Sequence, residues 1–194
     1  MKKIDEIITE IKRLEKELSH EIQKKEAEYY YKIQGKKIYF EQSVKKAQKK
    51  LSTTMASYIF HARFLHMITS PIIWLCLVPG FFLDGMVTIY QAICFPVYGI
   101  PKVMRKDYIV MDRQSLAYLN LIEKINCMYC GYFNGLIAYV QEIAARTEQY
   151  WCPIKHARKI RTIHSRYKMF FEYGDGEEFK KNLEKIRKQF DDVE

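Results

Sequence analysis

A nearly uncharged block in the middle of a basic chain constrains this sequence more than any other feature. Residues 51–101 contain only two charged side chains, Arg63 and Asp84, although the 194-residue chain has 32 Lys/Arg and 23 Asp/Glu. The run from Met67 to Ile100 is 34 residues long and its single charge is Asp84. About 20 apolar residues are enough for a membrane-spanning helix. The block therefore predicts a membrane-inserted segment, with a buried core hairpin of a soluble protein as the alternative.

The length and internal breakers of this block favour a helical hairpin. It is too long for one upright span, and Pro79-Gly80 and Asp84-Gly85 lie near its middle. We expect arms over residues 60–83 and 86–100 with a turn at Asp84. Basic residues flank the block on both sides, which places both ends and both termini in the cytoplasm. A single tilted or kinked span and a re-entrant second arm are the alternatives. For Asp84, an intramembrane carboxylate on an ion or proton path is the alternative to the turn.

Charge and periodicity divide the chain into three helical regions, which predicts an all-α fold. Residues 1–54 form a charged arm, in which residues 1–50 are one long helix with Gly35 as its only weak point. Residues 55–101 form the membrane-inserted hairpin, and residues 102–194 form a basic helical region. The arm carries an apolar seam with heptad spacing over residues 4–18. This seam predicts a homodimer through a short coiled coil, or else a solvated helix that packs on its own chain. It consists of Ile4, Ile7, Ile11, Leu14 and Leu18.

The third region is expected to contain helices separated by glycine and proline. Asp112 is a suitable N-cap for the helix that follows it. Gly131 and Gly135 are interpreted as a loop between two antiparallel helices, and a small-residue contact within one continuous helix is the alternative. Pro153 ends the second helix, and the turn at residues 174–176 precedes a short terminal helix.

Three cysteines and a histidine form the strongest set of potential ligands. Cys127-x2-Cys130 is followed by Cys152-x3-His156, and three thiolates with an imidazole suit a structural zinc site. The same set is compatible with iron or an iron–sulfur cluster. An unbroken helix over residues 136–150 would separate its ends by about 22 Å. One chain therefore closes the site only if that helix breaks or the loops fold back, whereas a head-to-tail dimer closes it directly. A metal-free protein in which the cysteines only pack is an equal alternative, and a redox dithiol ranks lower.

A basic stretch after Tyr150 predicts contact with an anionic surface. Residues 150–171 contain six Lys/Arg and no acid, and their apolar stripe and neighbouring hydrophobic block favour anionic lipids over nucleic acid. A solvated face packed on its own bundle is the remaining alternative. The residues expected at the lipid surface are Trp151, Lys155, Arg158, Lys159, Arg161, Arg166 and Lys168.

The strings DRQSLAYLN, EKINCMYCGYFNGLIAYVQEIAARTEQYWCPIKHARK and FEYGDGEEF resemble a family of small bacterial membrane proteins with no assigned activity. The likeness covers residues 107–180 and implies a bacterial source, hence the inner membrane. The sequence contains no glycine-rich phosphate loop, no nucleophile elbow and no Glu-x-x-His pair, so none of these motifs indicates an enzyme. The sequence therefore predicts a membrane-anchored helical protein with a cytoplasmic structural or sensory metal site. A metal-free scaffold that recruits a partner through its N-terminal helix is the alternative.

Overall fold

The computed structural model is mostly helical and describes residues 2–29, 31–34, 37–61 and 63–193. Within these ranges, the side chains of residues 2–9, 12, 33, 34 and 37 lie outside the description. The chain forms two compact units. Unit 1 is Met1–His61 with Asp112–Cys127, and unit 2 is Ala62–Met111 with Met128–Glu194.

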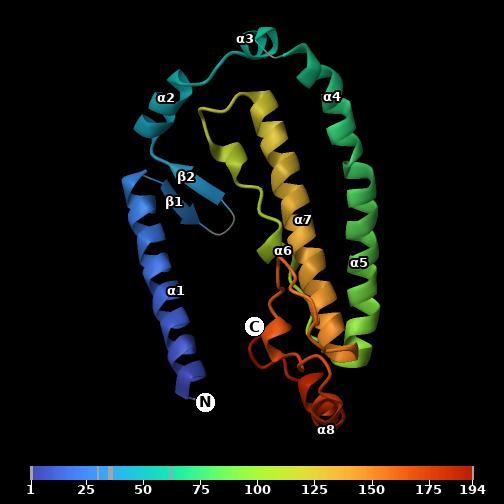
Figure 1. Cartoon of the computed structure of the whole chain (residues 1–194). Helices are drawn as coiled ribbons and strands as arrows, with labels where there is room; N and C mark the ends of the chain where they lie inside the picture. Colours follow the sequence, from blue (N-terminus) through green and yellow to red (C-terminus); the bar gives the residue numbers. More distant parts are fainter. Residues whose placement is uncertain (1, 30, 35–36, 62, 194) are drawn as a thin grey trace. The chain divides into compact units, whose positions relative to one another are not determined.

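Unit 1 begins with the helix α1 (Lys2–Glu28), which ends well before residue 50. A two-stranded antiparallel hairpin follows, β1 (Tyr31–Gln34) and β2 (Lys37–Phe40), in which Tyr31 pairs with Phe40 (Figure 1). The expected long helix is therefore wrong after Glu28, because aromatic and β-branched residues favour strands in this stretch. Gly35, the expected weak point of that helix, lies outside the described residues. The unit continues with α2 (Gln42–Lys50) and α3 (Met55–Phe60).

The described part of the apolar seam of α1 is exposed within the chain. Ile11, Leu14, Leu18 and Ile22 have exposed fractions between 48% and 62%. The side chains of Ile4 and Ile7, the first two residues of the expected seam, lie outside the description. An exposed apolar stripe on a charged helix is what a coiled-coil partner would cover, so the dimer stays a prediction.

In unit 2 the apolar block forms two almost continuous helices, α4 (Phe64–Leu75) and α5 (Leu77–Tyr98). The short break at Cys76 comes three residues before Pro79, whose missing N–H cannot bond the Leu75 carbonyl. Asp84 and Gly85 lie inside α5, so the expected turn between two hairpin arms is wrong. Gly99 ends α5 in the left-handed conformation, with φ of 68°. Such a terminal residue is usually glycine because a Cβ is disfavoured at positive φ.

The core of unit 2 lies between α5 and α7 (Leu121–Trp151), which run side by side in the same direction (Figure 1). Residues 99–120, here called the return segment, connect the two helices. It contains only the short helix α6 (Arg105–Tyr108) and a 3-10 turn at Arg113–Ser115. Its residues 100–111 pack back along the two helices, and Ile100, Val103 and Ile109 are buried. They join a core that contains Phe95, Tyr132, Leu136, Tyr139, Ile143 and Phe190.

The helix α7 continues through both glycines, so the loop expected at residues 131–135 is wrong. A Cβ on Gly135 would lie 2.6 Å from the carbonyl oxygen of Tyr108, and one on Gly131 would lie 3.1 Å from that of Val110. The glycines therefore admit the backbone of the return segment, which is the small-residue contact kept as the alternative. Close tertiary packing outweighs a cost of about 1 kcal/mol for each glycine in a helix.

The start of α7 also differs from the expectation, because Asp112 does not cap it. Asn120 is the N-cap: its side-chain oxygen accepts from the N–H of Glu123 at 3.0 Å, and the Glu123 carboxylate accepts from the N–H of Asn120 at 2.9 Å. This reciprocal pair satisfies two backbone donors at the helix end. Asp112 instead precedes the 3-10 turn.

The C-terminal part of unit 2 is less helical than expected. As predicted, α7 ends at Trp151, just before Pro153, but residues 152–175 contain only a bridge between Ile154 and Phe171 and a 3-10 turn at Tyr167–Met169. The short terminal helix is α8 (Gly176–Ile186), capped by the Asp175 side chain. The apolar stripe expected in residues 150–171 therefore does not form one helix face: Phe170 and Phe171 are buried, whereas Ile163 is 64% exposed.

Candidate functional site

The structure does not bring the four expected metal ligands together in one chain. Cys127 and Cys130 lie on α7, whereas Cys152 and His156 follow its last residue. Cys130 and Cys152 are 22 positions apart in the sequence, and an intervening helix of that length spans about 33 Å. Among the described residues, no three His, Cys, Asp or Glu side chains form a group that could hold a metal ion. Cys130, Cys152 and His156 are exposed, and Cys127 is half-buried.

The residues expected at a lipid surface divide into exposed and structural ones. Arg158, Lys159, Arg161 and Lys168 are exposed, and Trp151 is 54% exposed beside the ring of Tyr98. Lys155 pairs with Glu172, and Arg166 is only 3% exposed. The assignment of Arg166 to lipid is therefore wrong, because its charge is used inside the unit.

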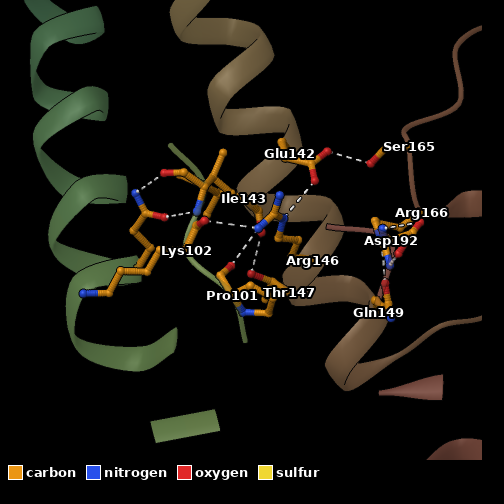
Figure 2. A network of polar contacts seen from close by, with 12 residues as sticks. Pro101, Lys102, Glu142, Ile143, Arg146, Thr147, Gln149, Ser165, Arg166 and Asp192 are labelled. Atoms are coloured by element: carbon orange, nitrogen blue, oxygen red, sulfur yellow. Dashed lines mark hydrogen bonds and ion pairs between the residues drawn. The ribbon is translucent and has the colours of Figure 1, made fainter. Parts of the chain in front are cut away.

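Arg166 holds the C-terminal end of the chain against α7 (Figure 2). Its guanidinium donates to both carboxylate oxygens of Asp192, at 3.0 and 2.9 Å, and its Nε donates to Gln149 at 2.6 Å. Gln149 in turn donates to the carbonyls of Ile186 and Gln189. Burial acts to raise the pKa of Asp192, but the hydrogen bonds and charge of Arg166 outweigh it and hold that pKa below its ordinary value.

A second buried charge pair fixes the return segment. Arg146 donates to Glu142 at 2.8 Å, as the i,i+4 spacing predicts, and also to the carbonyls of Pro101 and Lys102 (Figure 2). The other carboxylate oxygen of Glu142 accepts from Ser165 at 2.6 Å. The pair thus ties α7 to the irregular chain on two of its sides. Each charge is compensated, which is the condition for burying it.

Asp84 is the centre of a third set of polar contacts, which the sequence did not predict. Its carboxylate accepts from Arg105 of the return segment at 2.7 Å and from the hydroxyl of Tyr132 on α7 at 3.0 Å. Burial raises the pKa of Tyr132 to about 12, and the hydrogen bond to Asp84 acts in the same direction, so the hydroxyl stays a donor. Asp84 therefore joins three elements. No spacing or motif in the sequence predicts that Asp84 contacts Arg105 and Tyr132.

The helices α4 and α5 expose many large apolar side chains. Phe64–Tyr98 is the one helical run in the described residues that is long and apolar enough to cross a membrane, and only 11% of its most apolar stretch is buried. A contiguous apolar surface of this size on a protein marks an interaction with lipid or another protein. We call it the apolar face. Its large exposed side chains are Phe64, Leu65, Met67, Ile68, Ile72, Ile73, Leu75, Val78, Phe81, Phe82, Leu83, Met86, Ile89, Ile93 and Val97.

No family model, curated protein or solved structure matches this chain.

Proposed function

We propose that this chain is a non-enzymatic, membrane-anchored scaffold that lies in one leaflet of a bilayer through the apolar face. The observation that carries the proposal is the exposure of large apolar side chains along nearly all of Phe64–Tyr98. Full removal of one such side chain from water is worth about 1.5–3 kcal/mol. Lipid is therefore a better environment for this face than water.

Contacts within unit 1 support entry and exit on the same side of the membrane. Gln48 and Thr53 precede the apolar helices in sequence, and they bond Ala117 and Asn120, which follow them. A single crossing by α4 and α5 would separate these partners unless the return segment crossed back. That segment contains Lys102, Arg105, Lys106, Asp107, Asp112 and Arg113.

The return segment is unsuited to hydrocarbon. Its longest helix has four residues, and lipid-exposed irregular backbone is not tolerated in the bilayer core. Arg105 is also half-exposed where it meets Asp84. An orientation parallel to the membrane surface avoids this cost, because the apolar face then meets lipid while the return segment stays on the protein side.

Basic and aromatic residues of unit 2 support binding to anionic head groups. Arg158, Lys159, Arg161 and Lys168 are exposed, and each basic side chain near such a surface contributes about 1 kcal/mol. Trp151 and Tyr98 are in contact at the end of α5, and both are residue types that favour the membrane interface. Positive flanks on both sides of the block favour the cytoplasmic face of the bacterial inner membrane.

Flotation of the purified chain with phosphatidylglycerol-containing vesicles tests the anchor. We expect the triple variant Phe82→Ser, Ile89→Ser, Ile93→Ser to lose at least about 100-fold in partitioning, because three exposed apolar side chains are shortened. The matched control is Met104→Ser, Val110→Ser, Tyr173→Ser, which shortens three exposed side chains outside the apolar face and the basic segment. Equal partitioning of the two triple variants would refute the anchor.

A metal site shared between two chains is the second candidate. It is favoured by the exposure of Cys130, Cys152 and His156, which leaves them accessible to a partner copy. We expect one zinc per dimer, lost in Cys152→Ser, when metal is measured in chelator-free protein. Visible charge-transfer bands with bound iron would indicate an iron–sulfur cluster instead, and metal-free folded protein would exclude both.

A further inference from the structure

A pocket in unit 1 brings four lysines together without a carboxylate. Lys45, Lys46 and Lys49 come from one side of α2, and Lys124 comes from the first turn of α7. Ser52, Ala117 and Leu119 complete the lining. The pocket has a volume of about 400 Å³, which is within the range of small-molecule sites. We call it the lysine pocket.

Hydrogen bonds hold the two sides of the lysine pocket together. The side-chain oxygen of Gln48 on α2 accepts from the N–H of Ala117 at 3.3 Å, and Asn120 donates to the Thr53 hydroxyl at 3.2 Å. Asn120 also caps α7, so the first turn that carries Lys124 is fixed by the same residue. The lysines are therefore assembled by specific polar contacts from segments far apart in sequence.

The four lysines of this pocket are neighbouring like charges, of which Lys124 is half-buried and the other three are exposed. Lys45 and Lys49 are spaced i,i+4 on one helix, where like charges repel. Lys124 lies near the N-terminus of a 31-residue helix, where the helix dipole is also positive. None of the four lysines is in an ion pair within the described residues. The nearby Glu123 carboxylate is used by the cap of α7.

We propose that the lysine pocket binds a small anion with a multiply charged phosphate group. Lysine ammonium groups bind phosphate as point charges, and the Ser52 hydroxyl is a further donor. The positive end of α7 adds to the same field. Such a group belongs either to a soluble phosphorylated compound or to a phosphomonoester lipid head group. The inference uses contacts of unit 1 alone and does not depend on the membrane anchor.

Calorimetric titration of the full chain in non-ionic detergent with inorganic pyrophosphate tests the site. We expect saturable binding that weakens about tenfold in Lys49→Gln and again in Lys124→Gln, since each removes a charge-assisted hydrogen bond. Lys50→Gln is the matched control: it removes the same charge one position along α2, outside the pocket lining, and should change affinity less than twofold. Circular dichroism confirms that each variant is folded.

Two results would overturn the proposal. In the first, the unaltered chain does not bind pyrophosphate saturably, and it also binds vesicles with phosphatidic acid no better than the double variant Lys49→Gln, Lys124→Gln does. The other is equal weakening by Lys50→Gln, which would indicate diffuse attraction to a basic surface.

The same variants distinguish the two sources of the phosphate. Vesicles with phosphatidic acid are compared with vesicles with equal charge from phosphatidylglycerol, whose phosphate is a diester. A preference for phosphatidic acid that is lost in Lys49→Gln, Lys124→Gln and is competed by pyrophosphate indicates a lipid head group. Binding of pyrophosphate without that preference indicates a soluble ligand.

Discussion

Arg166 is the residue that most clearly links burial to a pH dependence. It is almost completely buried, and its main ionic partner is Asp192, close to the end of the chain. Because the folded-state pKa of Asp192 is below its ordinary value, the unfolded chain binds a proton more readily than the folded chain does. The stabilisation is therefore complete above the ordinary pKa of an aspartate, about 3.9. It is lost as the pH falls through the lowered folded-state value.

Asp192→Asn should accordingly lower the free energy of unfolding at pH 7, and this effect should shrink as the pH falls below the ordinary pKa of an aspartate, about 3.9. We expect about 1 kcal/mol at pH 7, since Asp192 is partly exposed and solvent screens the pair. Urea unfolding at several pH values measures this difference. Asp191→Asn, an exposed neighbour, is the control and should be near neutral. A loss that does not decrease as the pH is lowered through the acid range would show that the Asp192 charge is not the stabilising element.

Two glycines within helices should respond in opposite directions to replacement by alanine, one losing and the other gaining stability. A Cβ at Gly135 would meet the backbone of Tyr108 and Ile109 at 2.6 and 2.8 Å, whereas one at Gly85 would have nothing within 4 Å. Gly135→Ala should destabilise unit 2 by about 1–3 kcal/mol through overpacking. Gly85→Ala should stabilise it by about 0.5–1 kcal/mol, the ordinary gain of alanine over glycine in a helix. Thermal unfolding in detergent compares both variants with the unaltered chain. Stabilisation of both variants would contradict the close packing at Gly135.

At the scale of the elements, the sequence predicted a mostly helical chain, the end of α7 before Pro153 and the terminal helix after Gly174. It failed where tertiary contacts override local signals. Gly131 and Gly135 signal a loop, but they admit a neighbouring backbone, and Asp84-Gly85 signals a turn although Arg105 and Tyr132 bind that carboxylate within a helix. The cap at Asn120 was predictable, because Asn-x-x-Glu is a capping-box spacing.

For the candidate sites too, the sequence predicted which residues could act as ligands or charges but not which of them lie together or are buried. Spacing identified the Cys127/Cys130 and Cys152/His156 pairs, but whether the pairs meet depends on the continuity of α7, which the glycines obscured. Composition identified the basic segment after Trp151 but not that Arg166 is buried. The lysine pocket was not predicted, since it joins α2 to the start of α7 across many residues of sequence.

The exposed seam of α1 leads to a prediction about association. Leu14 and Leu18 are 51% and 62% exposed, and coiled-coil pairing would bury both. We expect Leu14→Asp, Leu18→Asp to convert a dimer to a monomer, measured by light scattering with size-exclusion chromatography in detergent. The control is Ser19→Asp, Gln23→Asp, which adds the same charges to α1 off the seam. A monomeric unaltered chain would exclude the dimer and, with it, a metal site shared between two copies.

At the scale of the whole molecule, segregation of charge was the most informative property of the sequence. It located the apolar helices and their basic flanks, but it did not distinguish a hairpin or a span from a helix lying along the surface. That distinction depends on which segments contact one another. The hydrogen bonds that join Gln48 and Thr53 to Ala117 and Asn120 are non-local, and no periodicity encodes them.

The depth of the apolar face in the bilayer distinguishes these orientations directly. Ile68, Phe82 and Ile93 are exposed along α4 and α5, and Cys76 lies between the first two. The other four cysteines, Cys94, Cys127, Cys130 and Cys152, are first replaced by serine, so that a polarity-sensitive dye attaches only at Cys76. In three further variants Cys76 is also replaced by serine, and the dye attaches to a new cysteine at Ile68→Cys, Phe82→Cys or Ile93→Cys. Quenching by lipids labelled at known depths then measures the depth of each dye.

For a helix pair lying along the surface, the four labels should have similar, shallow depths. An upright helix would instead separate positions 68 and 93 by about 37 Å along the membrane normal. A dye at Tyr173→Cys, an exposed residue outside the apolar face, is the control and should show no quenching by lipid. A monotonic change in depth from position 68 to position 93 would refute the surface orientation while leaving the membrane anchor itself intact. Either the return segment would then need to cross the bilayer with its charges, or the contacts of Gln48 with Ala117 and of Thr53 with Asn120 would be lost in the membrane.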